Sequence, residues 1–276
     1  MSFEKEYYEN PVFWDIKRYF ENQAELERFN KIISTIPSNV KSLLDVGCGN
    51  GVFLYLLKNK RSEISSVGLE RSKMAIEIAS KNFDVEIIEG NISSLPFRDA
   101  SFDCLTALEV IEHLPYEIYE RVLGEFERVA KKYIIISVPY EERRGLTQCP
   151  YCGCRFNPTF HLRRFNRKVL DNLFSNFKLT GFELICPEYE VYFHKVFSAL
   201  YQLIFKPSFP ENVICPACGY RKVNSSSSED GSFKNIAKDK VKNILSRFVP
   251  RRKKYRWAVC IYERGGQTPG YAGTKT

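Results

Sequence analysis

An apolar run that ends in alternating glycines constrains the fold of this chain more than any other feature. Residues 43–51 read LLDVGCGNG, so Gly47, Gly49 and Gly51 follow directly after the run. Glycine permits backbone dihedrals and close approaches that a side chain forbids, which is typical of a buried strand that turns tightly into a helix. We therefore expect backbone N–H groups and a helix N-terminus at the carboxyl end of a strand, where open α/β sheets bind ligands.

From residue 42 onward, short apolar runs alternate with helical patterns, and this alternation is the signature of βαβ units and a parallel sheet. Upstream, apolar residues spaced three and four apart over residues 12–36 predict a helical cover. The predicted strands lie near residues 42–46, 64–70, 84–89, 102–107, 133–138, 178–185 and 256–263, and the predicted helices near 51–59, 72–81, 115–131 and 167–175.

A dinucleotide-binding loop is the main rival for the glycine run. The strict G-x-G-x-x-G pattern is absent, because Val52 follows Gly49, Asn50 and Gly51. Glu70 ends the second predicted strand, about 20 residues further on, where a carboxylate can accept both hydroxyls of a ribose. The ligand expected at this edge therefore carries a ribose.

Four motifs, in this order and spacing, resemble the S-adenosylmethionine-dependent class I methyltransferases: LLDVGCGNG, VGLERS, GNISSLPF and FDCLTALEVIEHL. The resemblance covers roughly residues 40–185 and the final strand. It implies an α/β fold with a Rossmann-like seven-stranded sheet, whose last strand is antiparallel, and helices on both faces. It also implies S-adenosylmethionine as cofactor. The residues implied to bind it are Asp45, Gly47, Gly49 and Gly51 at the methionine part, Glu70 with its neighbour Arg71 at the ribose, and Asn91 and Ile92 at the adenine.

One position departs from that family. The family usually has Asp where this chain has Asn91. The amide oxygen of an asparagine still accepts a hydrogen bond, so we expect a weakened contact with the adenine amino group.

The stretch LEVIEHL places Glu109, Glu112 and His113 at i, i+3 and i+4, so on a helical turn they share a face. Together with His161 of HLRRFNR, they resemble the E-x-x-E-H plus distant histidine of ubiquinone-biosynthesis O-methyltransferases and of small-RNA 2′-O-methyltransferases. That resemblance implies a catalytic set of Glu109, Glu112, His113 and His161 around a magnesium or manganese ion. The alternative is that Glu109 lies near the cofactor and His113 packs beneath it, with no metal.

Five of the nine cysteines cluster in two knuckles, CPYCGC and CPACG. The pairs Cys149 with Cys152 and Cys215 with Cys218 have the spacing of paired zinc knuckles, and four thiolates make a closed, structural site. Redox pairs and free thiols are the alternatives. Cys154 or His161 could replace one of the four ligands, and a zinc-bound His161 would be lost to the catalytic metal.

These motifs predict a domain organisation. We expect an N-terminal helical cover over residues 1–40 and a methyltransferase domain over 41–264. Insertions at 141–160 and 190–254 would carry the split zinc site, and residues 265–276 would form a disordered tail.

The insertions also suggest where a partner would bind. Residues 191–205 are aromatic and apolar, and a basic helix is predicted over 233–254. These segments could lie on an anionic membrane surface and reach a lipid-linked substrate, or they could form an ordinary capping helix pair. A net charge of +8 is modest for an RNA enzyme, which makes nucleic acid the less favoured partner.

The sequence thus predicts a cytoplasmic S-adenosylmethionine-dependent methyltransferase, because neither a membrane span nor a signal peptide is present. The acceptor is expected to be an oxygen of a small, carrier-linked or lipid-linked metabolite. Two alternatives stay open: an RNA 2′-O-methyltransferase, and a non-catalytic methyltransferase-like zinc-binding module.

Overall fold

The computed structural model describes residues 8–142, 145–191, 209–210, 213–220, 222 and 251–265. These residues belong to two compact units. The sheet unit comprises the described residues of 8–142, 162–186 and 257–265. The cysteine unit comprises the described residues of 143–161 and 187–256.

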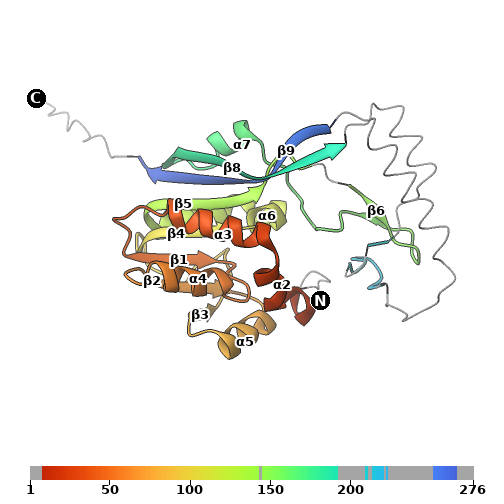
Figure 1. Cartoon of the computed structure of the whole chain (residues 1–276), viewed down its shortest axis with the longest axis horizontal. Helices are drawn as coiled ribbons and strands as arrows, with labels where there is room; N and C mark the ends of the chain where they lie inside the picture. Colours follow the sequence, from red (N-terminus) through yellow and green to blue (C-terminus); the bar gives the residue numbers. More distant parts are fainter. Residues whose placement is uncertain are drawn as a thin grey trace, which may run out of the picture. The chain divides into compact units, whose positions relative to one another are not determined.

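Seven strands form one sheet in the order β3-β2-β1-β4-β5-β9-β8 (Figure 1). The first five pair in parallel, and β9 runs antiparallel to β5. This topology confirms the predicted fold class, including the antiparallel last strand. The bounds are β1 (Ser42–Val46), β2 (Ser65–Glu70), β3 (Glu86–Glu89), β4 (Phe102–Leu108), β5 (Ala130–Pro139), β8 (Phe177–Val191) and β9 (Arg251–Arg264).

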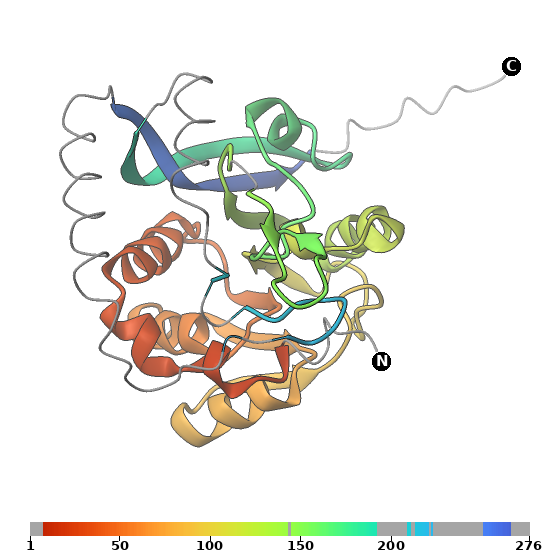
Figure 2. The same cartoon turned by 90° about the vertical axis from the view of Figure 1, so that its right-hand side faces the viewer.

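Helices cover both faces of this sheet because its central strands are apolar on both sides. Ile134 and Ile136 belong to the core with α6 (Tyr116–Val129) and α7 (Arg167–Asp171). Ile135, between them, belongs to the core with α3 (Gln23–Thr35) and α4 (Val52–Lys60). Figure 2 shows the red and orange α3 and α4 on one side of the strands and the yellow-green α6 on the other.

Capping residues set where the helices begin. Asn22 accepts hydrogen bonds from two backbone amides at the start of α3, and Ser72 accepts one at the start of α5 (Lys73–Asn82). Gly51 begins α4 with a left-handed φ of 75°. The predicted helical segment at 12–36 is present as three pieces, η1 (Pro11–Trp14), α2 (Ile16–Glu21) and α3.

The cysteine unit contains a small hairpin of its own. Strand β6 (Thr147–Gln148) pairs antiparallel with β7 (Arg155–Phe156), and the first cysteine knuckle lies between them. Phe156 belongs to one apolar cluster with Cys149 and Cys215, and its ring packs against Phe160 and Phe209. This unit therefore has a small aromatic core beside its sulfurs.

One element differs from the prediction. The basic run at 251–254 is the start of β9 and not the end of a helix, so the predicted helix over 233–254 is wrong for these four residues. An ion pair of 3.7 Å between Lys254 and Glu188 joins this part of β9 to β8. Three predicted segments lie outside the described residues: residues 192–205 of the apolar stretch, residues 233–250 of the basic helix, and residues 266–276 of the tail.

Among the helices that the structure describes, none combines the length and the apolar character that crossing a membrane requires.

The tight packing of β2 generates a first prediction. A Cβ on Gly68 would lie 2.5 Å from the Cys48 sulfur and 2.7 Å from a Leu54 methyl carbon, so Gly68→Ala should lower the free energy of unfolding by about 1–3 kcal/mol. Gly124→Ala is the matched control, because a Cβ on this exposed α6 position meets nothing within 4 Å. The control should be neutral or more stable by up to about 1 kcal/mol. Urea denaturation checks both, and equal effects would contradict the packing account.

Candidate functional site

The glycine loop lies between β1 and α4, with Gly47, Gly49 and Gly51 at φ of 68°, 55° and 75°. These left-handed conformations are ones that glycine adopts readily. The backbone N–H of Gly47 donates to the carbonyl of Leu69, 2.7 Å away on β2. The loop is therefore held against the end of the neighbouring strand.

At two of these glycines, a side chain would clash with a neighbouring residue. A Cβ on Gly47 would lie 2.8 Å from a methyl carbon of Val110, and one on Gly49 would lie 2.7 Å from the ring of Trp14. The glycines thus let Val110 and Trp14 pack directly on the loop backbone at the carboxyl edge of the sheet.

Glu70 fixes the other side of this edge. One of its carboxylate oxygens accepts a hydrogen bond of 2.9 Å from the Gly49 N–H. The other accepts bonds of 2.8 and 2.9 Å from the N–H groups of Arg71 and Ser72. The side chain is only 6% exposed. Glu70 therefore joins the ends of β1 and β2 at the position where the ribose is predicted.

Asp45 lies beneath the loop. It is buried, and its carboxylate accepts a hydrogen bond of 2.6 Å from the Thr106 hydroxyl on β4. Burial raises the pKa of Asp45 to about 7, although the bond from Thr106 opposes this shift. A positively charged ligand above the loop would favour the ionised form.

The predicted adenine contacts have a different geometry. The amide oxygen of Asn91 accepts bonds of 2.9 Å from both the N–H and the hydroxyl of Ser93, so it closes a local turn. Ile92 is partly buried against the core. The oxygen expected to receive the adenine amino group thus already accepts two hydrogen bonds, and the adenine contact of Asn91 stays a prediction.

The segment after β4 does not form the predicted helical turn. Glu109 has a left-handed φ of 58°, and only Ile111–His113 form a short 3-10 turn, η2. The N–H of Glu109 donates to the Ser137 carbonyl, 2.9 Å away on β5, which keeps this residue with the sheet. The prediction that Glu109, Glu112 and His113 share one helical face is therefore wrong.

The carboxylate of Glu109 belongs to a buried polar cluster. It accepts a bond of 2.8 Å from the Trp257 indole N–H and one of 3.2 Å from the Ser137 hydroxyl. Arg28 of α3 donates to the same hydroxyl and lies 4.9 Å from the centroid of the Trp257 ring. Burial opposes the charge of Arg28, but the charges of Glu109 and Glu25 raise its pKa.

Sequence reasoning missed Arg28 and Trp257. The available signal was an arginine between the apolar positions Leu26 and Phe29 of an amphipathic helix. Such an arginine is expected to find a buried acidic partner.

Glu112 has the opposite environment. It is fully buried, and neither of its carboxyl oxygens has a hydrogen-bond partner among the residues that the structure describes. Burial, together with the charge of Glu109, raises the pKa of Glu112 well above its ordinary value. Burial therefore disfavours the charged form of Glu112, and a cation beside it would favour that form.

Neighbouring segments hold the η2 turn in place. The N–H of Leu162 donates to the Glu112 carbonyl at 2.7 Å, and the Arg163 guanidinium donates to the Leu114 carbonyl. The same guanidinium lies 3.7 Å from the centroid of the Tyr119 ring and 4.4 Å from that of Tyr116. The backbone that carries Glu112 and His113 is thus held by contacts with residues 162 and 163.

The two histidines of that set belong to different units. His113 lies in η2 of the sheet unit, where its ring is 6.1 Å from the Tyr8 ring, edge to face. His161 lies in the cysteine unit, where its carbonyl accepts a bond from the Asn157 amide. The role of His161 as a metal ligand stays a prediction.

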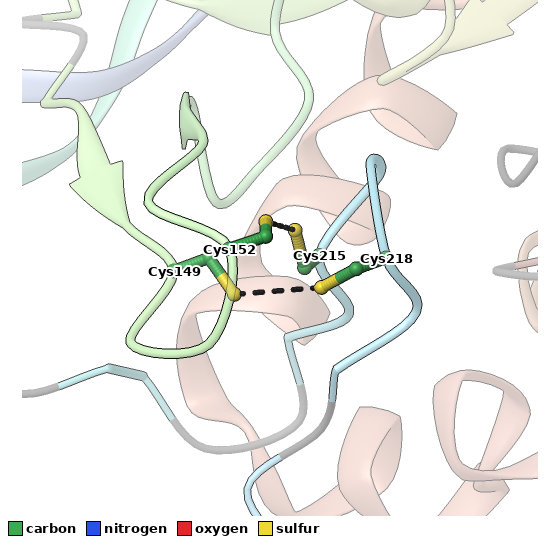
Figure 3. A group of neighbouring side chains, drawn as sticks. All are labelled: Cys149, Cys152, Cys215 and Cys218. Atoms are coloured by element: carbon green, nitrogen blue, oxygen red, sulfur yellow. Dashed lines mark hydrogen bonds between the residues drawn. The ribbon is translucent and has the colours of Figure 1, made fainter.

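The four predicted cysteines converge within the cysteine unit (Figure 3). The sulfurs of Cys149 and Cys218 are 3.7 Å apart, and those of Cys152 and Cys215 are 3.6 Å apart. Four thiolates around zinc, at bonds of about 2.3 Å, would have sulfurs about 3.8 Å apart. The arrangement therefore fits a tetrahedral zinc ion.

The two knuckles have the same backbone geometry. Gly153 and Gly219 have φ of 74° and 71°, and their N–H groups donate to the carbonyls of Cys149 and Cys215. Although burial opposes it, hydrogen bonds from the amides of Ala217 and Cys218 lower the pKa of Cys215 to about 7. Burial and hydrogen bonds with the neighbouring thiols raise the pKa of Cys218 to about 12. A zinc ion among the sulfurs would supply the positive charge that favours all four thiolates.

Known proteins resemble this chain in sequence and in fold. Residues 44–136 match a family model described as a methyltransferase domain. The demethylmenaquinone methyltransferase of Thermotoga maritima is 31% identical over 166 residues, which cover 53% of this chain and 72% of that protein. The phthiotriol/phenolphthiotriol dimycocerosates methyltransferase of Mycobacterium tuberculosis is 26% identical over 113 residues, so the chain spans only 41% of its length.

A solved structure from Thermotoga maritima, described as an S-adenosylmethionine-dependent methyltransferase and possible histamine N-methyltransferase, aligns over 94% of this chain and 99% of its own. The TM-score is 0.52 at 20% identity, so this similarity concerns the fold alone. The demethylmenaquinone relative adds similarity of sequence over most of its own length. The chain therefore belongs to the S-adenosylmethionine-dependent methyltransferases.

Proposed function

We propose that this methyltransferase transfers the methyl group to an oxygen of a small or lipid-linked acceptor. Two relatives are named as methyltransferases of demethylmenaquinone and of phthiotriol/phenolphthiotriol dimycocerosates. These names support an acceptor with a lipid part. The observation that carries the oxygen assignment is Glu112, a fully buried carboxyl group without a hydrogen-bond partner among the described residues, next to His113. A hydroxyl acceptor must lose its proton as it attacks. The ionised form of Glu112, which a bound cation would stabilise, can accept that proton.

The residues at the carboxyl edge fit the cofactor. S-adenosylmethionine, when bound, supplies a methyl group on a positively charged sulfur. In the proposal, Gly47 and Gly49 let Val110 and Trp14 pack directly on the loop, so that these side chains and the loop backbone line the site of the methionine part. The carboxylate of Glu70 accepts the ribose hydroxyls, and Asp45 contributes negative charge beneath the loop. Arg71, Gly51, Asn91 and Ile92 complete the proposed cofactor-binding set.

A divalent cation is part of the proposal. Glu112 and His113 of the sheet unit would hold magnesium or manganese, which lowers the pKa of a bound hydroxyl. His161 belongs to the cysteine unit and stays a predicted ligand. Glu109 does not fit as a ligand, since its carboxylate is bonded to Trp257 and Ser137 and lies near the charge of Arg28. We propose that Glu109 instead holds the backbone that leads into η2.

The four cysteines are proposed to bind a structural zinc ion. Cys149, Cys152, Cys215 and Cys218 would then join the predicted insertions at 141–160 and 190–254 into one module. The sulfur spacing and the paired knuckle geometry support this assignment. The predicted cytoplasmic location and the predicted membrane contact of the basic helix remain predictions.

A labelled-methyl assay tests the acceptor assignment. Protein incubated with 13C-methyl S-adenosylmethionine and a panel of demethylated quinols and catechols should place the label on an oxygen, as read by NMR of the product. Glu70→Ala should weaken cofactor affinity about 30-fold, since hydrogen bonds to a charged group contribute about 1.5–3 kcal/mol. Glu89→Ala, at the exposed end of β3, is the matched control. Label on carbon, nitrogen or RNA, or full affinity in Glu70→Ala, would contradict the proposal.

The buried carboxyl of Glu112 predicts a pH-dependent stability. An ordinary glutamate has a pKa of about 4.3, and in the folded protein this pKa is raised. Below about pH 4 the group is protonated in both states, so Glu112→Gln should match the wild type. At higher pH the unfolded chain releases the proton first. The wild type should then lose up to about 1.4 kcal/mol per pH unit relative to Glu112→Gln, until the folded pKa is passed.

Urea denaturation of both proteins between pH 4 and 8, without added divalent ions, measures that difference. Added manganese should then stabilise the wild type at pH 8 but not Glu112→Gln, because a ligand that binds only the folded state adds stability. Glu117→Gln, on the exposed start of α6, controls for the loss of a carboxylate. Parallel stability curves for wild type and Glu112→Gln would show that the group is not buried as described.

Metal analysis tests the cysteine site. Purified protein should contain one zinc ion per chain by elemental analysis. Cys149→Ser and Cys215→Ser should lose it. Cys154→Ser is the matched control, because its sulfur lies outside the four-sulfur group although it belongs to the same knuckle. Retention of zinc in Cys215→Ser, or its loss in Cys154→Ser alone, would exclude the assigned ligand set.

A further inference from the structure

We propose that residues 8–14, the N-terminal strap, cover the bound cofactor, and that Tyr8 and Trp14 position its methionine part. The inference rests on the proposed cofactor site at the glycine loop and adds two residues to it. Neither aromatic side chain belongs to the motifs that identify the family.

Trp14 lies directly on the glycine loop. A Cβ on Gly49 would lie only 2.7 Å from the indole ring, so the ring rests on the bare backbone of that residue. The side-chain amide of Asn50 donates to the Trp14 carbonyl at 3.1 Å. Gly49, Asn50 and Gly51 are all buried. Any ligand that lies along this backbone must contact Trp14.

Tyr8 spans the same edge from one flanking strand to the other. Its ring lies 5.1 Å from the guanidinium carbon of Arg71, which follows β2. It also lies 6.1 Å from the ring of His113, which follows β4, and 6.3 Å from the ring of Trp14. Because β1 lies between β2 and β4 in the sheet, Tyr8 passes over the end of β1, where the glycine loop begins.

Hydrogen bonds hold the strap in this position. The Tyr8 carbonyl accepts bonds from the Trp14 indole N–H at 2.7 Å and from the Ser72 hydroxyl at 2.8 Å. The Glu9 carboxylate accepts bonds of 3.2 and 3.1 Å from the N–H groups of Lys73 and Met74. These amides form the first turn of α5, where the helix dipole favours a negative charge. The strap is thus fastened to both the β1 loop and the end of β2.

The chemistry of the strap suits this cofactor. The sulfonium and amino groups of S-adenosylmethionine are positively charged, and the faces of tryptophan and tyrosine rings attract cations. Rings on the glycine loop would also exclude water from the methyl group. The demethylated product lacks the sulfonium charge, so the strap should favour the substrate form of the cofactor over the product.

Cofactor titration with a fluorescence readout tests the proposal. S-adenosylmethionine should change the tryptophan emission of the wild type, and Trp14→Phe should lose this change while still binding in calorimetry. Trp14→Ala should weaken binding of S-adenosylmethionine about tenfold and binding of its demethylated product less. Phe20→Ala is the matched control, because this aromatic of the N-terminal region packs on Tyr55 and Phe83 and should leave both affinities unchanged.

Four results would overturn the proposal. If Trp14→Ala binds S-adenosylmethionine within twofold of the wild type, or if Trp14→Phe keeps the wild-type emission change, the strap does not contact the cofactor. If Trp14→Ala binds more tightly, Trp14 competes with the cofactor. In these cases the cofactor site itself still stands. If well-folded wild type does not bind at all, the proposed cofactor site fails, and the strap assignment fails with it.

Discussion

The carboxylate of Glu70 accepts backbone hydrogen bonds from both sides of the gap between β1 and β2. One comes from the glycine loop, and two come from the turn that leads into α5. Without the Glu70 carboxylate, no single group would accept hydrogen bonds from both the N–H of Gly49 and the turn before α5. The strap depends on the same turn, because Ser72 and the first amides of α5 are its attachment points. The cofactor edge is therefore one connected network.

A second network fixes the segment after β4. On one side, Trp257 and Ser137 bind the Glu109 carboxylate, with Arg28 beside them. On the other side, Leu162 and Arg163 bind the carbonyls of Glu112 and Leu114. The turn between these anchors has little freedom, which suits residues that must face an acceptor. Of its two carboxyl groups, Glu109 accepts hydrogen bonds from Trp257 and Ser137, whereas Glu112 has no hydrogen-bond partner among the described residues and is the one proposed to act in the reaction.

The fold was predictable because local signals and topology agree. The strand β1 and the start of α4 follow directly from LLDVGCGNG, and the antiparallel last strand follows from the family resemblance. The cysteine pairs were also predictable, because each C-P-x-C-G sequence favours the same tight turn around its two sulfurs. By contrast, the i, i+3, i+4 spacing of Glu109, Glu112 and His113 suggested a helix that the sheet prevents, because β5 holds the backbone of Glu109. Arg28 and Trp14 act through contacts distant in sequence, which no local pattern encodes.

A crystal structure of the full chain with the demethylated cofactor product, S-adenosylhomocysteine, would show whether the cofactor binds at Glu70 and beneath the N-terminal strap. We predict ribose hydroxyls within hydrogen-bond distance of the Glu70 carboxylate and the homocysteine part in contact with the Trp14 ring, with residues 8–14 still packed on the glycine loop. A product molecule bound elsewhere, or one at Glu70 with residues 8–14 displaced from the glycine loop, would contradict this prediction.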